Sequence, residues 1–167
     1  LAALTDSKRL TASSRERFFA FLESHEAIRV GIGLASVEEI DQLNILNATH
    51  LAMRRAVLAL GAPLPDFVLV DGLPVRGLPA PSRAIIGGDG LSLLIAAASV
   101  AAKVVRDRLM LELDARHPGY GLAANKGYGT RQHLLALERL GVSPAHRRSF
   151  APVAERLQEP LFPREAP

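Results

Sequence analysis

The chain has 167 residues, enough for one domain with a sizeable core, and its 49% hydrophobic and 22% charged residues exclude a disordered or collagen-like chain. It contains no cysteine, which excludes disulfides, thiolate zinc sites and a cysteine nucleophile and leaves oxygen and imidazole groups as the possible metal ligands. No apolar stretch approaches the roughly 20 residues that span a membrane.

The charge is distributed unevenly along the chain. The net charge is +3, but residues 103–156 contain ten Lys and Arg against five Asp and Glu, whereas residues 1–102 contain nine against ten. A basic stretch of this kind is typical of a surface that contacts nucleic-acid phosphates. An ordinary solvated helical surface has the same composition, so charge alone leaves both interpretations open.

Two elements are expected near the start of the chain. Residues 11–24 show an amphipathic pattern in which Ser13 and Glu16 have the spacing of a capping box, so this segment is predicted to be a helix. In Ile28–Leu34, β-branched residues alternate with Arg and Gly, which predicts a strand.

A long helix and a buried strand are expected next. Ser36 and Glu39 form a second capping-box pattern at the start of an amphipathic segment that continues to Gly61, which predicts a helix over this span. The run Phe67–Val70 consists of four apolar residues and is followed by an Asp-Gly turn. We therefore expect a strand that is covered on both faces.

The second half of the chain is predicted to contain one more strand and two helices. The strand is expected at Arg83–Ile86, and an Ala-rich helix follows over residues 92–116. After a loop that contains Gly, Tyr and Lys at residues 120–129, another helix is predicted over residues 130–140. Strands that alternate with helices in this way indicate an α/β fold.

Two carboxylates follow the last two predicted strands. Asp71 comes directly after the first of them, and Asp89 follows the second, at the start of the next helix. Because ligand sites of open α/β sheets lie beyond the carboxyl ends of strands, both side chains could face one crevice. Carboxylate oxygens are the ligands that Mg²⁺ prefers, and such ions assist phosphodiester hydrolysis. A turn at Asp71 and a helix cap at Asp89 explain the same residues without a function.

Two further groups of polar residues receive no catalytic role. Asp107 lies between two arginines inside the predicted helix of residues 92–116, and we expect it to form an ion pair rather than to bind a metal. The five histidines never have the spacing of a metal-binding pair on one helix face.

The loop after the Ala-rich helix and the segment near residue 147 are candidate nucleic-acid contacts. Tyr128 lies close to Lys126 on a glycine-rich backbone, where a ring can stack on a sugar or base while the ammonium meets a phosphate. The alternative is a turn whose tyrosines only cover the core. Arg147 and Arg148 form a compact basic patch that either contacts phosphates or is simply solvated.

Taken together, these segments resemble ribonuclease HII, the type 2 ribonuclease H of bacteria. The resemblance covers nearly all of residues 4–153, and its segments include Val68-Leu-Val-Asp-Gly72, Gly88-Asp89 leading into Ile95–Val104, Lys126-Gly-Tyr-Gly-Thr130 and His146-Arg-Arg-Ser-Phe-Ala-Pro152. It implies a ribonuclease H-like α/β fold with a mixed sheet flanked by helices and further helices at the C-terminal end. We expect one domain over residues 1–153 and a flexible tail over residues 154–167.

The resemblance also implies an activity. The family hydrolyses the RNA strand of RNA–DNA hybrids and cuts on the 5′ side of ribonucleotides embedded in duplex DNA, with Mn²⁺ or Mg²⁺ as the cofactor. Asp71 and Asp89 match catalytic residues that bind the metal ions, and Tyr128 matches the residue that stacks on the sugar beside the ribonucleotide. A cytoplasmic protein, usually a monomer, is implied. The remaining nucleic-acid contacts are expected from Lys126, Arg147 and Arg148.

The sequence departs from the family pattern in two places. The family has an Asp-Glu-Ala-Gly-Arg-Gly segment on a first, central strand, followed by a second strand, and these 167 residues contain neither. This segment carries two more metal-binding carboxylates and the backbone that reads the ribose 2′-hydroxyl. Shortly after Asp89, the family usually has Lys where this chain has Leu91. We therefore expect little or no nuclease activity from these 167 residues alone, and an aggregation-prone sheet edge.

Two other functions remain open at this point. A non-catalytic module that binds RNA–DNA hybrids would need only the basic C-terminal third and Tyr128. An unrelated α/β phosphohydrolase would explain Asp71 and Asp89 but not the other matching segments.

Overall fold

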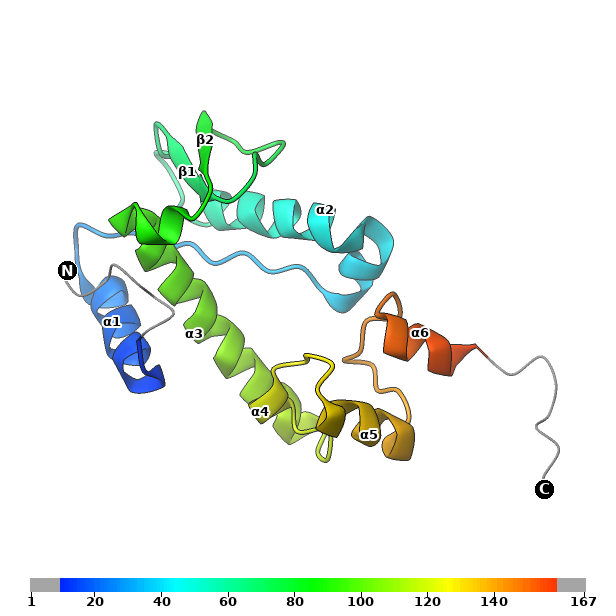
Figure 1. Ribbon diagram of the computed structural model, residues 1–167. Coiled ribbons are helices and arrows are strands. Elements are labelled where there is room, and N and C mark those ends of the chain that lie inside the picture. Colours follow the sequence, from blue (N-terminus) through cyan, green and yellow to red (C-terminus); the bar gives the residue numbers. More distant parts are fainter. Residues whose placement is uncertain (1–9, 159–167) are drawn as a thin grey trace, which may run out of the picture. The chain divides into compact units, whose positions relative to one another are not determined.

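The computed structural model describes residues 10–158, which form a mostly helical α/β fold with a small parallel sheet (Figure 1). Within this range the elements are, in chain order, α1 (Ala12–Ser24), α2 (Val37–Leu58), β1 (Val68–Asp71), β2 (Ser82–Ile85), the 3₁₀ helix η2 (Gly88–Gly90), α3 (Leu93–Arg116), α4 (Leu122–Asn125), α5 (Arg131–Leu140) and α6 (Ala151–Leu157). The predicted α/β class is confirmed. None of the helices in this range is long and apolar enough to cross a membrane.

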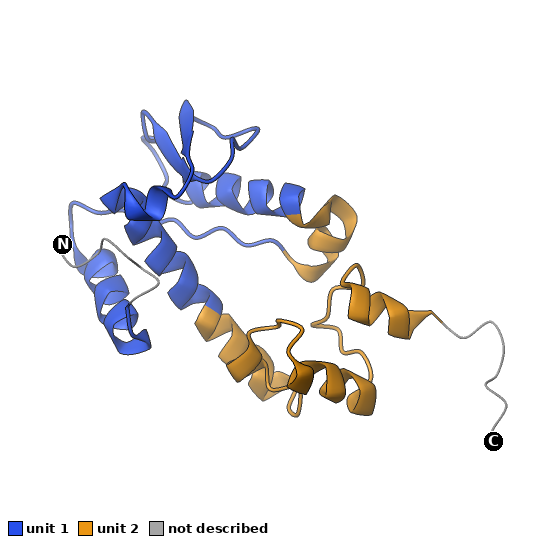
Figure 2. Ribbon diagram, in the orientation of Figure 1, with its two compact units in different colours: residues 1–35, 46–106 blue, residues 36–45, 107–167 orange. Residues whose placement is uncertain are grey.

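The chain divides into two compact units, which Figure 2 shows in different colours. Among the described residues, unit 1 comprises residues 10–35 and 46–106, and unit 2 comprises residues 36–45 and 107–158. Both strands therefore lie in unit 1, and α4, α5 and α6 lie in unit 2. Each unit has its own hydrophobic core.

The core of unit 1 forms between α1 and the first half of α3. Phe19 packs against Ala96, Val100 and Val104, all of them buried. The small side chains of α3 let the Phe19 ring approach closely, as the Ala-rich sequence suggests. The N-cap of α1 lies two residues before the predicted capping box: it is Thr11, whose Oγ1 accepts a hydrogen bond from the Ser14 N–H at 3.2 Å.

The capping box at the start of α2 is confirmed. The Ser36 N–H donates to Glu39 Oε2 at 2.9 Å, and the Glu39 N–H donates to Ser36 Oγ at 3.2 Å. The helix is less regular than predicted, because Asn44 has φ 66° and ψ 166° and interrupts the helical backbone. Ile45 and Leu46 beside this interruption are more than half exposed, so the predicted apolar face is not buried there.

The strand predicted at Ile28–Leu34 is wrong for the described part of the chain. This segment has no strand partner there and lies instead along α2. A Cβ on Gly31 would lie 2.1 Å from Ala56 O, and a Cβ on Gly33 would lie 1.9 Å from Ala52 O. The glycines therefore permit a backbone-to-backbone approach that any side chain would prevent.

The two sheet strands are parallel, with Val68 opposite Ser82 and Asp71 opposite Ile85. Their positions agree with the prediction to within one residue. The expectation that the first strand is covered on both faces is wrong, because only Val70 of β1 is buried. The mixed sheet that the resemblance implies is not seen either, since residues 10–158 contain only this parallel pair.

The core of unit 2 forms where α3, α5 and α6 meet. Leu137 and Val153 are fully buried at its centre, and Tyr120 and Met110 pack beside them. Helix α6 extends to Leu157, so residues 154–157, which were expected in a flexible tail, are helical. Gln158 is the C-cap of α6, and the rest of that expected tail, residues 159–167, lies outside the described residues, as do residues 1–9.

Candidate metal and nucleic-acid site

Two carboxylates lie at the carboxyl ends of the two parallel strands. Asp71 is the last residue of β1, and Asp89 lies in η2, directly after β2. Asp71 Oδ1 accepts a hydrogen bond from the Gly88 N–H at 2.8 Å. This bond joins the two strand ends and brings the backbone next to Asp89 against the Asp71 side chain. The predicted juxtaposition at one sheet edge is therefore present at the level of the backbone.

Two glycines make this arrangement possible. Gly87 has φ 66° and ψ 30°, a left-handed conformation that turns the chain out of β2. Gly88 is buried, and a Cβ there would lie 2.5 Å from Ile95 Cδ1 and 3.4 Å from Asp71 Oδ1. A Cβ at position 88 would therefore require the Ile95 side chain to shift, whereas it would only touch Asp71. No role was predicted for these two glycines from the sequence, although the run Gly-Gly-Asp-Gly that contains them could have indicated a tight turn.

The two carboxylates fit a hard divalent cation in ligand type but not in number. Asp71 is exposed and Asp89 is partly exposed, so both are accessible to an ion from solvent. In residues 10–158, no group of three or more His, Asp or Glu side chains is arranged to hold a metal ion. Because Mg²⁺ and Mn²⁺ prefer several oxygen ligands, Asp71 and Asp89 by themselves do not make a complete metal site.

Two exposed leucines follow Asp89 along the chain. Leu91, which ends η2, is 76% exposed, and Leu94 in the first turn of α3 is 73% exposed. Neither side chain can donate a hydrogen bond or a positive charge to a phosphate. The Leu91 position thus lacks the cation that the family pattern usually places there.

The Tyr128 ring is exposed on a backbone that is held at several points. Tyr128 as a whole is 72% exposed, whereas its backbone N–H donates a hydrogen bond to Asn125 O at 2.9 Å. Its carbonyl oxygen accepts from the Thr130 N–H at 2.8 Å and contacts His133 Nδ1 at 2.9 Å. A ring that protrudes from a fixed backbone is suited to stacking.

Tyr120, the other tyrosine of this loop, covers the core, which was the alternative role considered from the sequence. Tyr120 is buried in the core of unit 2, and its hydroxyl donates to Gly141 O at 3.0 Å. Of the two rings, Tyr120 therefore covers the core and Tyr128 is available to a partner.

Lys126 takes part in an ion pair. Its Nζ lies 3.8 Å from Asp107 Oδ1, and both side chains are only 21% exposed. The ion pair expected for Asp107 is thus formed across the loop, with Lys126, in addition to any contact with the adjacent arginines. The Lys126 ammonium can therefore contact a phosphate only if it binds Asp107 and the phosphate at the same time, or leaves Asp107 for the phosphate.

The segment with Arg147 and Arg148 is held by a residue that the sequence analysis missed. Asp41 accepts hydrogen bonds from the Arg148 N–H at 2.8 Å and the Ser149 N–H at 2.9 Å, and from the Ser149 hydroxyl. The guanidinium of Arg147 lies 5.6 Å from the centroid of the Phe150 ring, a cation–π distance. Since Asp41 is more than 100 residues away in sequence, no local pattern could reveal this contact.

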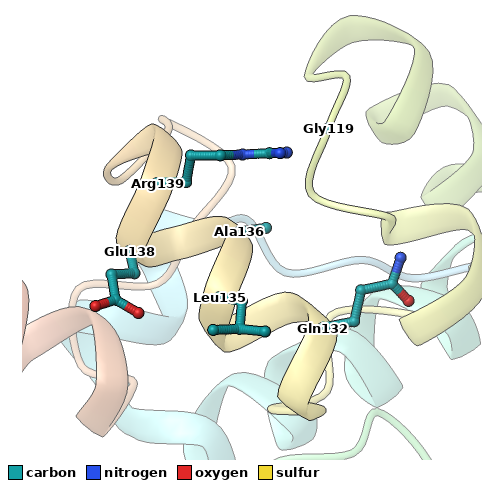
Figure 3. Close-up of a pocket in the computed structure, with 6 residues that line it drawn as sticks. All are labelled: Gly119, Gln132, Leu135, Ala136, Glu138 and Arg139. Atoms are coloured by element: carbon teal, nitrogen blue, oxygen red, sulfur yellow. The ribbon is translucent and has the colours of Figure 1, made fainter.

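A separate hollow of about 510 Å³ lies on unit 2 (Figure 3). In Figure 3, Arg139 points towards the Gly119 segment and Glu138 points away from it. The lining includes none of the predicted site residues, and it does not gather groups with a common chemistry. We assign it no function. It is lined by Gly119, Gln132, Leu135, Ala136, Glu138 and Arg139.

The predicted site residues therefore form two groups, one in each unit. Asp71 and Asp89 lie at the sheet edge of unit 1, where Asp71 Oδ1 accepts from the N–H of Gly88, the residue before Asp89. The nucleic-acid candidates of unit 2 lie on two loops, one before α5 and one before α6. They are Lys126, Tyr128, Arg147 and Arg148.

Comparisons with known proteins agree on one family. A family model described as ribonuclease HII matches residues 1–153. The chain is 56% identical over 157 residues to ribonuclease HII of Desulfitobacterium hafniense (strain Y51), a match that covers 94% of this chain and 60% of that protein. It is 53% identical over 163 residues to ribonuclease HII of Rhodospirillum rubrum, which covers 98% of this chain and 74% of that protein.

The fold has a counterpart among solved structures. The crystal structure of the ribonuclease H2 from Pyrococcus horikoshii OT3 matches with a TM-score of 0.70 at 23% sequence identity. The match covers 92% of this chain and 79% of that one. The likeness shows that the two chains share a fold. The present chain spans about 60% of the length of the Desulfitobacterium relative.

Proposed function

The chain belongs to the ribonuclease HII family, and on that premise we propose that it acts as a divalent-metal-dependent endonuclease. The proposed substrates are the RNA strand of RNA–DNA hybrids and duplex DNA with embedded ribonucleotides, which is cut on the 5′ side of the ribonucleotide. The observation that carries the proposal is the hydrogen bond from the Gly88 N–H to Asp71 Oδ1, which joins the two acidic strand ends.

Asp71 and Asp89 are the proposed catalytic residues and metal ligands. The Gly88 N–H orients the Asp71 carboxylate through Oδ1, and Oδ2 is left to meet a cation. A bound Mg²⁺ or Mn²⁺ would supply an activated water and stabilise the leaving oxygen of the phosphodiester. Asp89, in the turn beside Asp71, adds a second negative charge that favours a cation at this edge.

The proposed substrate contacts lie on unit 2. The exposed Tyr128 ring can stack on a sugar or base, because its backbone is fixed at both its N–H and its carbonyl. Arg147 and Arg148 lie on a segment that Asp41 holds, and guanidinium groups suit bidentate contact with phosphate. We propose that these residues, with Lys126, bind the backbone of the hybrid.

Asp71 and Asp89 alone are too few ligands for the proposed cleavage. Residues 10–158 gather no set of three donors, and a two-ion mechanism needs several carboxylates. We therefore propose that residues 1–167 on their own cleave little or nothing, and that activity depends on further carboxylates joining Asp71 and Asp89.

The test compares two proteins on one substrate, a DNA duplex that carries a single ribonucleotide. One protein is expressed from the complete reading frame, and the other is residues 1–167 alone. We expect metal-dependent nicking on the 5′ side of the ribonucleotide by the first protein with Mn²⁺ or Mg²⁺, none with EDTA, and little from the second. Nicking by residues 1–167 at the rate of the first protein would show that two carboxylates suffice.

A non-catalytic module that binds RNA–DNA hybrids is the second candidate. One observation favours it: the Tyr128 ring is exposed on a fixed backbone, while the described carboxylates do not complete a metal site. Binding of the ribonucleotide duplex without any nicking, by the protein from the complete reading frame, would support this function over the first.

A further inference from the structure

Two buried histidines of unit 2 contact each other and have no role in the function proposed above. His133 lies in α5 and is 1% exposed, and His146 lies in the segment before α6 and is 7% exposed. Their Nε2 atoms are 3.1 Å apart, which is a hydrogen-bond distance. One of the two nitrogens must therefore carry a hydrogen and the other must accept it.

The contacts at the two ends of the pair determine where the hydrogens are. His146 Nδ1 faces the Ser143 hydroxyl at 2.8 Å, which can donate or accept, and the Ser143 N–H at 3.1 Å, which can only donate, so His146 Nδ1 is the acceptor and its hydrogen lies on Nε2. His133 Nδ1 faces Tyr128 O at 2.9 Å, which can only accept, so the hydrogen of His133 lies on Nδ1. The two assignments agree: His146 Nε2–H donates to His133 Nε2.

This arrangement connects the two loops that carry the proposed nucleic-acid contacts. At one end it binds the backbone carbonyl of Tyr128, which also accepts from the Thr130 N–H. At the other end, His146 directly precedes Arg147 and Arg148, whose segment Asp41 also holds. A chain of hydrogen bonds thus runs from the Tyr128 backbone through both imidazoles to Ser143.

Resting on the proposed function, we propose that His133 and His146 are positioning residues: as a neutral pair, they hold the Tyr128 loop and the Arg147–Arg148 segment in the relative arrangement that binds the substrate strand. Neither histidine touches the substrate. Each acts through the loop that it holds, so its loss changes binding without removing a contact to the nucleic acid.

An additional proton would disrupt these hydrogen bonds. A second hydrogen on His133 would point Nε2–H at the Nε2–H of His146, and a second hydrogen on His146 would break the bond from the Ser143 N–H to Nδ1 and leave only the Ser143 hydroxyl oxygen to accept. Burial, followed by the nearness of His133, lowers the pKa of His146 below its ordinary 6.5, and His117 at the end of α3 acts in the same direction. The Tyr120 ring also faces His146, with 4.8 Å between the ring centroids.

The direction of the pH effect follows from this shift. The unfolded chain takes up a proton on His146 near pH 6.5, whereas the folded chain does so only at a lower pH. The pair therefore contributes its full stabilisation above the ordinary pKa, and the contribution is lost as the pH falls through the folded-state pKa. Substrate affinity that depends on the pair should fall over the same interval.

The test measures affinity for the single-ribonucleotide duplex in EDTA, so that no cleavage occurs, with the protein from the complete reading frame. His133→Phe keeps a ring but no hydrogen bond, and we expect a roughly five- to tenfold loss of affinity. His133→Asn can still donate to the Tyr128 carbonyl and should recover part of the loss. His117→Asn, outside the hydrogen-bonded chain, is the matched control and should change affinity by less than about twofold.

The double variant His133→Phe with Tyr128→Ala tests whether His133 affects binding through the Tyr128 loop. Tyr128→Ala alone should lose at least about fivefold in affinity, the cost of a lost stacking contact. Adding His133→Phe should then cost little more, because the loop no longer presents its ring. Losses that multiply would overturn the inference. If Tyr128→Ala has no effect, the proposed role of Tyr128 fails, and the pair itself is judged by the next measurement.

The hydrogen positions can be read without nucleic acid. Nitrogen NMR of the imidazoles at neutral pH should show both rings neutral, with the hydrogen of His133 on Nδ1 and that of His146 on Nε2. A charged ring, or the opposite tautomer in either residue, would overturn the inference even if the substituted proteins fail to fold.

Discussion

At the scale of single residues, Asp41 shows how a distant side chain can order a candidate binding segment. Its carboxylate accepts hydrogen bonds from two consecutive backbone N–H groups and one hydroxyl at the start of α6. Burial raises the pKa of Asp41, but the hydrogen bonds from Ser149 and Arg148 and the charge of Arg147 outweigh it, so the pKa is lowered overall. The charged form is therefore the one that stabilises the segment.

Replacing Asp41 by Asn should lower the free energy of unfolding by about 1 kcal/mol at pH 7, the cost of weakening hydrogen bonds to a charged acceptor near the surface. Because the folded-state pKa of Asp41 is lowered from 3.8, its contribution is present above that value and is lost as the pH falls through the folded-state pKa. Urea unfolding at several pH values measures this. Asp66→Asn, at an exposed position, is the control. Equal stability of D41N and the parent protein at pH 7 would contradict this account.

The candidate site was predictable where it depends on neighbouring elements in the sequence. Asp71 and Asp89 follow short apolar strands, and the position of strand ends in a parallel sheet brings such residues together. Asp41 and the His133–His146 pair were not predictable, because each depends on a contact between segments that no local pattern connects. The spacing of the five histidines indicated no role for any of them, because the contact between His133 and His146 depends on their burial in the folded chain.

At the scale of secondary structure, local signals gave four of the six α-helices in the described residues and failed for one strand. The capping box of Ser36 and Glu39 and the Ala-rich pattern of α3 are complete within a few turns, so the start of α2 and both ends of α3 were predicted to within one residue. A strand exists only with a partner, and Ile28–Leu34 packs on α2 instead. Helix α6 was not predicted, because most of it was expected to belong to a tail that starts at residue 154, although Pro152 is well tolerated in a first helical turn.

The contact between Gly33 and α2 gives a prediction at this scale. A Cβ at Gly33 would lie 1.9 Å from Ala52 O, so Gly33→Ala must move either the segment or the helix. We expect the free energy of unfolding to fall by about 1–3 kcal/mol, as for other overpacked sites. Thermal or urea unfolding measures the change. Gly90→Ala, where a Cβ would meet nothing within 4 Å, should cost much less, and a similar loss in both variants would contradict the proposed close contact.

At the scale of the whole molecule, the sheet is the least protected element. It has only two strands within the described residues, and Phe67, Leu73 and Ile86 beside its strands are 54%, 70% and 78% exposed. Short sheets with exposed edges and apolar side chains associate readily with other chains. These features support the sequence-based expectation of an aggregation-prone edge.

Residues 1–167 alone should therefore self-associate in solution, and light scattering over a range of concentrations measures this. Phe67→Lys places a charge on the exposed apolar surface and should shift the population towards the monomer. Lys introduced at Leu157, an exposed position on α6 in unit 2, is the control and should leave association unchanged. A monodisperse monomer at all concentrations would refute this expectation.

The family, the fold and the two acidic strand ends converge on one claim, that Asp71 binds the metal ion that assists phosphodiester cleavage. The most direct test is the nicking rate of the Asp71→Asn variant, in the protein from the complete reading frame, on a duplex with one ribonucleotide. The account predicts a rate at least about a hundredfold lower, with duplex affinity within about twofold of the parent protein. A variant that cuts at the parental rate would contradict the claim.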